Sequence, residues 1–167
     1  MEHQAFYLTE ATVELAKERG KCVDSDKTRY GQGVFPWELR AKGANELANF
    51  KPELDWETLR KDMKTHGVRN ATLMAIAPVE SSSVVINSTN GIEMPMSLIS
   101  VKESKAGSLT QVVPEYHKLK HKYQLMWEQK NCDGYLKTAC VLAAYIDQSI
   151  STNTFYNPAH WPDRKVP

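Results

Sequence analysis

A short apolar run in the middle of the chain constrains the fold more than any other feature of the sequence. Residues 72–77 read Thr-Leu-Met-Ala-Ile-Ala, and Pro78 follows them. A continuous run of this length, without alternating polar positions, is typical of a strand buried on both faces, as in a parallel sheet. Proline lacks the N–H group that a sheet needs, so Pro78 ends this strand. The chain is therefore predicted to have an α/β fold.

The residues after Pro78 predict a tight turn and the N-terminus of a short helix. Glu80 is followed by three consecutive serines, Ser81, Ser82 and Ser83, and the helix is expected to end near Asn90. Ligands of α/β folds collect at the carboxyl ends of strands, and a helix N-terminus offers free N–H groups to an anion. The serines are therefore candidates for binding phosphate. The alternative is that one serine only caps the helix and the others are solvated.

The first segment of the chain predicts an amphipathic helix. Leu8, Ala11 and Leu15 have helical spacing, and Gly20 ends the pattern. The helix begins almost at Met1 without a capping residue. We therefore expect either that the natural chain starts further upstream or that a partner satisfies the free N–H groups of the first turn.

Two further helices are expected before the apolar run. Pro36 occupies a favoured first helical position, and this short helix is expected to end near Gly43. Asp55 is a good N-cap for the next helix, which Gly67 ends. Its apolar stripe consists of Trp56, Leu59 and Met63.

The second half of the chain predicts a hairpin and two helices. The β-prone residues 98–101 and 109–113 flank a turn at residues 104–107, which we expect to be exposed. Two apolar stripes at helical spacing follow, and we expect both to be part of the core. The first stripe consists of Tyr116, Leu119, Tyr123, Met126 and Trp127, and the second of Tyr135, Ala139, Leu142, Ile146 and Ile150.

Composition narrows the class of protein. The 167 residues include 21 Lys and Arg against 20 Asp and Glu, so no excess of positive charge favours nucleic acid or an anionic membrane surface. No stretch approaches the roughly 18 apolar residues of a membrane span. The three cysteines, Cys22, Cys132 and Cys140, are odd in number and irregularly spaced, which suits a reducing compartment. A cytoplasmic protein with one domain is the simplest interpretation.

Two segments near the apolar run resemble the large, catalytic subunit of class I ribonucleotide reductase. They are residues 69–83 (RNATLMAIAPVESSS) and 87–93 (NSTNGIE). Shorter similar stretches lie at residues 14–20, 64–67, 111–114, 133–136 and 147–154, so the resemblance covers essentially the whole chain. It is strongest to class Ia and related phage forms. The family often has threonine in place of Ser81 and a polar residue in place of Val79.

The resemblance implies that residues 1–167 are the C-terminal portion of a ten-stranded α/β barrel, mostly helical with a buried strand and a β-hairpin, and incomplete as a domain. It also implies that one loop binds the diphosphate of the substrate. The residues of this loop are Pro78, Val79, Glu80, Ser81, Ser82 and Ser83.

The implied activity is the reduction of ribonucleoside diphosphates to deoxyribonucleoside diphosphates for DNA synthesis. The family's radical and redox cysteines and its allosteric domain would precede Met1, and its tyrosine pair and cysteine-bearing tail would follow Pro167. We therefore expect no catalytic residue in this chain and no activity of the chain alone. The expected partners are the N-terminal portion of the large subunit, a small subunit with a metal-based radical, and a thioredoxin-type reductant.

Two alternatives of other classes stay open. The chain could be a noncatalytic fragment that serves only as an interaction or structural piece. A freestanding phosphate-binding module is less consistent with the sequence, because one strand and a hairpin cannot close a barrel.

Some conspicuous residues are expected to have structural roles. His117 and His121 have the spacing of a zinc pair, but neighbouring lysines would repel a cation, so we expect a solvated helical face and no metal site. Cys132 and Cys140 match none of the family's catalytic cysteines. The side chain of Glu80 would repel a phosphate and is expected to turn away or to cap the helix.

Overall fold

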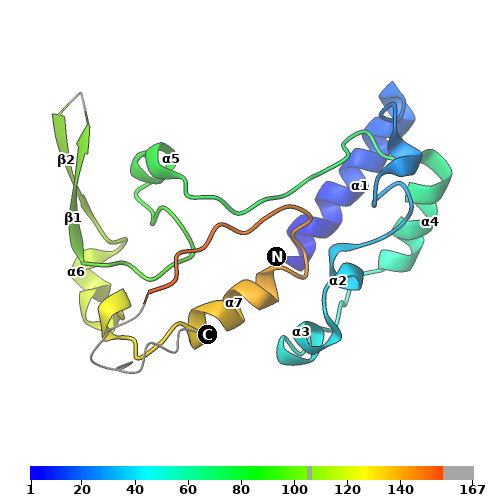
Figure 1. Cartoon of the computed structure of the whole chain (residues 1–167). Coiled ribbons are helices and arrows are strands. Elements are labelled where there is room, and N and C mark those ends of the chain that lie inside the picture. Colours follow the sequence, from blue (N-terminus) through cyan, green and yellow to red (C-terminus); the bar gives the residue numbers. More distant parts are fainter. Residues whose placement is uncertain (105–106, 156–167) are drawn as a thin grey trace. The chain divides into compact units, whose positions relative to one another are not determined.

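The computed structural model describes residues 1–104 and 107–155, which form two compact units (Figure 1). The first unit comprises Met1–Ile76 and Leu136–Ile150, and the second comprises Ala77–Tyr135 and a segment that begins at Ser151. In this described part of the chain the architecture is helical with one two-stranded antiparallel hairpin. Among the described residues, no helix combines the length and the apolar character needed to cross a membrane.

The first unit is built from helices around an aromatic and aliphatic core. Helix α1 (Glu2–Arg19) packs against α4 (Trp56–His66), and short helices η1 (Ser25–Lys27), α2 (Pro36–Leu39) and α3 (Lys42–Leu47) lie between them in the sequence. The last part of α7 (Asp133–Leu142) also belongs to this unit. The largest fully buried apolar side chains are Phe35, Met63, Val13 and Val68.

Helix α4 confirms its prediction in full. The carboxylate of Asp55 accepts a hydrogen bond from the Thr58 N–H at 3.0 Å, which caps the first turn. The stripe of Trp56, Leu59 and Met63 is buried. Gly67 has a φ of 73°, and its N–H bonds to the carbonyl of Met63, so the helix ends there as expected.

Helix α1 exists as predicted, but the predicted buried face is wrong. Leu8 and Ala11 are exposed, and Leu15 is only half-buried. The buried residues are Ala5, Thr9, Thr12, Val13 and Ala16.

The expected end of the second helix near Gly43 is also wrong. Pro36 opens α2, but this helix stops at Leu39 and Gly43 lies inside α3.

The apolar run at residues 72–77 does not form a strand buried on both faces. The segment is extended and makes one parallel β-bridge, between Ile76 and Ile150. The Ile76 N–H donates to the Ser149 carbonyl at 3.0 Å, and the Gln148 N–H donates to the Met74 carbonyl at 3.1 Å. Met74 is buried, whereas Ala75 and Ala77 are exposed. The backbone thus pairs on one side with residues 148–150, and only one face is covered.

The second unit contains helix α5 (Glu80–Val85) and the predicted hairpin of β1 (Ile99–Ser104) and β2 (Gly107–Val112). The strands pair in antiparallel register from Ile99 opposite Val112 to Ser104 opposite Gly107. This confirms the hairpin, while residues 105 and 106 of its predicted turn lie outside the described residues.

The predicted helix over residues 116–127 is broken in the structure. It is replaced by α6 (Tyr116–Leu119), η2 (Lys120–Lys122) and η3 (Met126–Glu128). The backbone of Tyr123 is extended, and the Tyr123 hydroxyl donates a hydrogen bond to the Pro114 carbonyl at 2.7 Å. Met126 is buried, but Trp127 is exposed, so the expected core role of Trp127 is wrong.

The second predicted helix is shorter than expected, because α7 ends at Leu142. Ile146, which was assigned to its stripe, is buried beyond the helix end. Ile150 forms the bridge to Ile76 instead.

Candidate functional site

The serines lie in the first turn of α5, at the end of the extended segment. Val79 is the N-cap of this helix, and its side chain makes no capping bond. The alternative in which a serine caps the helix is therefore wrong. Because the helix begins at Glu80, the N–H groups of its first residues have no carbonyl partner inside the helix.

The three serine side chains differ in exposure. Ser81 and Ser82 are exposed to solvent, whereas Ser83 is fully buried. The hydroxyl groups of Ser81 and Ser82 can therefore reach a ligand outside the helix, and the burial of Ser83 makes it part of the support of the loop. Pro78 and Val79 are exposed as well, and the side chain of Glu80 lies outside the described residues.

The loop is closed by hydrogen bonds between its own backbone groups. The Val79 N–H donates to the Asn90 carbonyl at 2.7 Å, so this N–H group is used inside the loop. The Ser83 N–H donates to the Val79 carbonyl at 2.8 Å, and the Ser88 N–H donates to the Ser83 carbonyl at 2.9 Å. Between them, Asn87 adopts a positive φ of 50°, which allows the chain to turn back after the helix.

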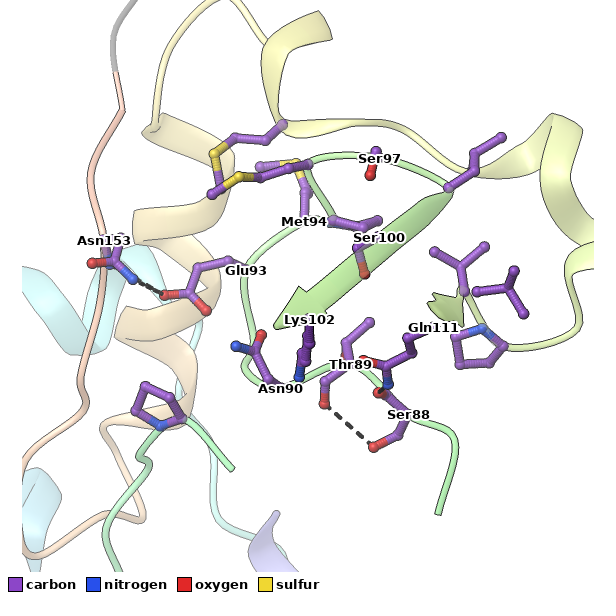
Figure 2. Close-up of a pocket in the computed structure, with 18 residues that line it drawn as sticks. Ser88, Thr89, Asn90, Glu93, Met94, Ser97, Ser100, Lys102, Gln111 and Asn153 are labelled. Atoms are coloured by element: carbon purple, nitrogen blue, oxygen red, sulfur yellow. Dashed lines mark hydrogen bonds between the residues drawn. The ribbon is translucent and has the colours of Figure 1, made fainter. Parts of the chain in front are cut away.

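A cavity of about 280 Å³ lies in the same unit, between the returning loop and the hairpin. Figure 2 shows Ser88, Thr89 and Asn90 of the loop together with Ser100, Lys102 and Gln111 of the hairpin around it. Pro78 lines this cavity, but Ser81 and Ser82 do not. The structure therefore brings one residue of the predicted loop to the cavity and leaves the two exposed serines outside it.

The cavity wall combines apolar side chains, such as Met94 and Met126, with polar ones that carry both signs of charge. Glu93 accepts hydrogen bonds from Asn153, at 3.2 Å from the backbone N–H and at 3.0 Å from the side-chain amide (Figure 2). Lys102 comes from β1. Near this wall, burial raises the pKa of Tyr135, and the Glu93 carboxylate raises it further.

Sequence reasoning missed two residues that hold the loop. Asn90 accepts the Val79 N–H, and the side-chain amide of Gln111 on β2 donates to the Ser88 carbonyl at 2.9 Å. No spacing rule connects Gln111 with a residue more than twenty positions away in the sequence.

The histidines and cysteines lie in ordinary surroundings. His117 and His121 are exposed, and no cluster of three potential metal ligands occurs in residues 1–104 and 107–155. Cys132 donates to the Phe155 carbonyl, with 2.9 Å between sulfur and oxygen, and Cys140 lies 3.5 Å from the Ala44 carbonyl oxygen. All three cysteines are half-buried free thiols.

Comparison with known proteins gives a consistent result. The family described as "Ribonucleotide reductase, barrel domain" matches residues 1–166. The chain is 48% identical over 162 residues to "Ribonucleoside-diphosphate reductase 1 subunit alpha" of Salmonella typhimurium, which covers 97% of this chain and 21% of the relative. It is 47% identical to the Escherichia coli protein of the same name, with the same coverage.

A phage protein is also similar. The "Ribonucleoside-diphosphate reductase subunit alpha" of Enterobacteria phage T4 is 40% identical over an alignment of 168 residues that covers 99% of this chain and 22% of the relative. The chain thus spans about a fifth of the length of the curated relatives it matches. This chain belongs to the ribonucleotide reductase family, and its residues 1–166 match that family's barrel domain.

Proposed function

We propose that the chain works as part of the large subunit of a ribonucleoside-diphosphate reductase and that its loop at residues 78–83 binds the diphosphate of the substrate. The observation that carries this proposal is the exposure of Ser81 and Ser82 in the first turn of α5. Two hydroxyl groups and the N–H groups of a helix start suit the oxygens of a phosphate, because these groups can donate hydrogen bonds to the oxygens and the helix start carries a partial positive charge.

The residues of the loop would have different roles. Ser81 and Ser82 would donate hydrogen bonds to the diphosphate, and the backbone N–H group of Glu80 would point toward it as well. Ser83 is buried and would hold the loop in shape. Val79 would contribute indirectly, because its N–H group already binds the Asn90 carbonyl.

The parallel bridge supports a place for this chain in a ten-stranded α/β barrel. It joins Ile76 to Ile150, which are far apart in the sequence. Such a pairing of distant segments is the connection from which parallel sheets and barrels are built. In this proposal residues 1–167 are one portion of the barrel, and the N-terminal portion of the large subunit completes it.

The radical and the electrons would come from outside this chain. The proposed partners are the N-terminal portion of the large subunit, a small subunit with a metal-based radical, and a thioredoxin-type reductant. By itself the chain is expected to have no reductase activity, since none of its cysteines corresponds to the family's catalytic cysteines.

Replacing Ser81 and Ser82 by alanine in the reassembled enzyme tests the loop. We expect the binding of cytidine diphosphate to weaken by about 2 to 4 kcal/mol, because two hydrogen bonds to a charged group are lost. The melting temperature should stay nearly constant, because both side chains are exposed. Ser108→Ala, at an exposed serine of β2, is the matched control.

A purely structural loop would behave differently. The double variant would then leave the dissociation constant of cytidine diphosphate unchanged. That result would contradict the assignment of residues 78–83 to substrate binding.

A further inference from the structure

The hairpin is joined to the serine loop by one polar side chain. Gln111 lies on β2, where it pairs with Ser100 of β1, and its side-chain amide donates to the Ser88 carbonyl at 2.9 Å. Figure 2 shows Gln111 beside Ser88 at the wall of the cavity. The side chain is half-buried, so this hydrogen bond is partly shielded from competition with water.

Two backbone hydrogen bonds connect the segment that Gln111 binds with α5. The same Ser88 whose carbonyl binds Gln111 donates its N–H to the Ser83 carbonyl at 2.9 Å. Two residues later, the Asn90 carbonyl accepts the Val79 N–H at 2.7 Å. Residues 88–90 therefore bind α5 at two points, which are the N-cap Val79 and the buried Ser83.

These contacts stabilise the start of α5. Val79, the N-cap, makes no side-chain capping bond, and α5 is only six residues long. A helix this short has little stability of its own. The direction of its first N–H groups and of Ser81 and Ser82 is therefore set by the segment that returns along residues 88–90, and this segment is fixed to the hairpin by Gln111.

We propose that Gln111 is a positioning residue for the serine loop, through which the hairpin sets the affinity for the substrate diphosphate. This inference rests on the proposed function of residues 78–83. Gln111 itself does not touch the diphosphate. It fixes the position of the Ser88 carbonyl. The backbone of residues 83–90 then fixes the orientation of Ser81 and Ser82.

The test compares Gln111→Met with the parent in the reassembled enzyme. Methionine keeps the length of the side chain and removes the donor, and Gln111→Glu, which keeps the shape and replaces the donor by an acceptor, is a second variant. We expect the dissociation constant of cytidine diphosphate to rise roughly threefold to tenfold, as for one lost hydrogen bond. The dissociation constant of cytidine, which has no phosphate, should stay within twofold. Gln124→Met, at an exposed glutamine of the same unit, is the control.

A combined variant distinguishes positioning from general support of the fold. If Gln111 acts through the serines, Gln111→Met should change the affinity for cytidine diphosphate less than twofold when Ser81 and Ser82 are already alanine. An equal effect in both backgrounds, or an equal loss of cytidine and cytidine diphosphate binding, would overturn the proposal.

The failure of this inference can be told apart from failure of the proposed function. If Ser81→Ala with Ser82→Ala weakens diphosphate binding while Gln111→Met and Gln111→Glu do not, only the positioning role is overturned. If the serine variant has no effect on the dissociation constant of cytidine diphosphate, the loop does not bind the diphosphate. In that case the positioning role of Gln111 is overturned as well.

Discussion

One carboxylate near the chain start connects three segments of the first unit. Oε1 of Glu2 accepts hydrogen bonds from the backbone N–H groups of Glu53 and Leu54, at 2.8 and 2.9 Å, and from the Trp56 indole at 3.0 Å. The Tyr145 hydroxyl lies 3.4 Å from Oε2. Glu2 therefore holds α1 to the segment that leads into α4.

These contacts shift the pKa of Glu2 and the pKa of Tyr145. Burial acts to raise the pKa of Glu2, but the hydrogen bonds from Leu54, Trp56 and Glu53 outweigh it and lower the pKa below the usual value of a glutamate. Burial, with the Glu2 carboxylate beside it, raises the pKa of Tyr145 to about 12. Both shifts favour the charged carboxylate and the neutral phenol in the folded chain.

The stability of the chain should therefore depend on Glu2 and on pH. Because the pKa of Glu2 is lowered by folding, its contribution is complete above the pKa of the unfolded chain and is lost as the pH falls through the folded value. We expect Glu2→Gln to lower the free energy of unfolding by about 1 to 2 kcal/mol at neutral pH, because hydrogen bonds to a charged acceptor become neutral ones. Urea unfolding measured from pH 7 down to pH 3 checks this.

The outcome at low pH is the sharper part of the test. The difference between Glu2→Gln and the parent should shrink as the pH falls, since the parent then loses its own carboxylate. Glu10→Gln, at an exposed position of the same helix, should change little at any pH. A difference that is independent of pH would show that the charge of Glu2 does not stabilise the fold.

Single residues also explain why the face of α1 was not predicted. Thr9 and Thr12 are buried, although a pattern of apolar residues treats threonine as polar. The Thr9 hydroxyl donates to the Ala5 carbonyl at 2.8 Å, and the Thr12 hydroxyl accepts the Asn70 N–H at 2.7 Å. Their polar atoms are thus satisfied inside the unit, and only the tertiary partner Asn70 makes the position of Thr12 suitable for the interior.

At the level of elements, the extended segment at residues 72–77 is anchored by the carboxylate of Asp147. Its two oxygens accept the Leu73 N–H at 2.9 Å and the Met74 N–H at 2.6 Å. The parallel bridge between Ile76 and Ile150 follows directly. The carboxylate thus begins the pairing of the two segments, which the backbone bonds then continue.

Removing this carboxylate should loosen the pairing. We expect Asp147→Ala to lower the free energy of unfolding by about 1.5 to 3 kcal/mol, because two N–H groups lose a charged acceptor. Amide hydrogen exchange at Leu73, Met74 and Ile76 should become faster, which localises the effect. Asp26→Ala, at an exposed aspartate of the same unit, provides the comparison. Unchanged exchange at Leu73 and Met74 would contradict the role assigned to Asp147.

Elements with local signals could be predicted, and those set by distant partners could not. Helix α4 carries its cap, its stripe and its terminating glycine within 13 residues, from Asp55 to Gly67, and all three were confirmed. The strands of the hairpin pair with each other, so their signals are also local. The break at Tyr123 depends on a bond to the Pro114 carbonyl, and the one-sided pairing of residues 72–77 depends on residues 147–150.

For the candidate site, the sequence predicted a helix start at the serines but not the contacts that support it. The position of Ser81 and Ser82 in the first turn of α5 agrees with the predicted helix N-terminus after Pro78. The burial of Ser83 and the bond from Gln111 could not be predicted, because both depend on how residues 86–91 fold back onto the hairpin.

At the level of the whole chain, large apolar side chains remain exposed in both units. In the second unit Ile99 and Val101 lie on one face of β1, and Val112, opposite Ile99, shares this face. All three are exposed, and so are Val85 and Ile86 at the end of α5. An exposed apolar face on a two-stranded hairpin favours association, because contact removes it from water.

The isolated chain is therefore expected to self-associate and to bind a hydrophobic dye such as 8-anilinonaphthalene-1-sulfonate. Val101→Lys should weaken self-association about tenfold, because it places a charge in the middle of the apolar face of the hairpin. Val23→Lys, at an apolar residue that is 96% exposed in the other unit, should have little effect. Sedimentation at increasing protein concentration, together with dye fluorescence, measures both. A parent chain that stays a monomer at high concentration and does not bind the dye would contradict this expectation, whereas equal effects of the two variants would show that the association does not use this face of the hairpin.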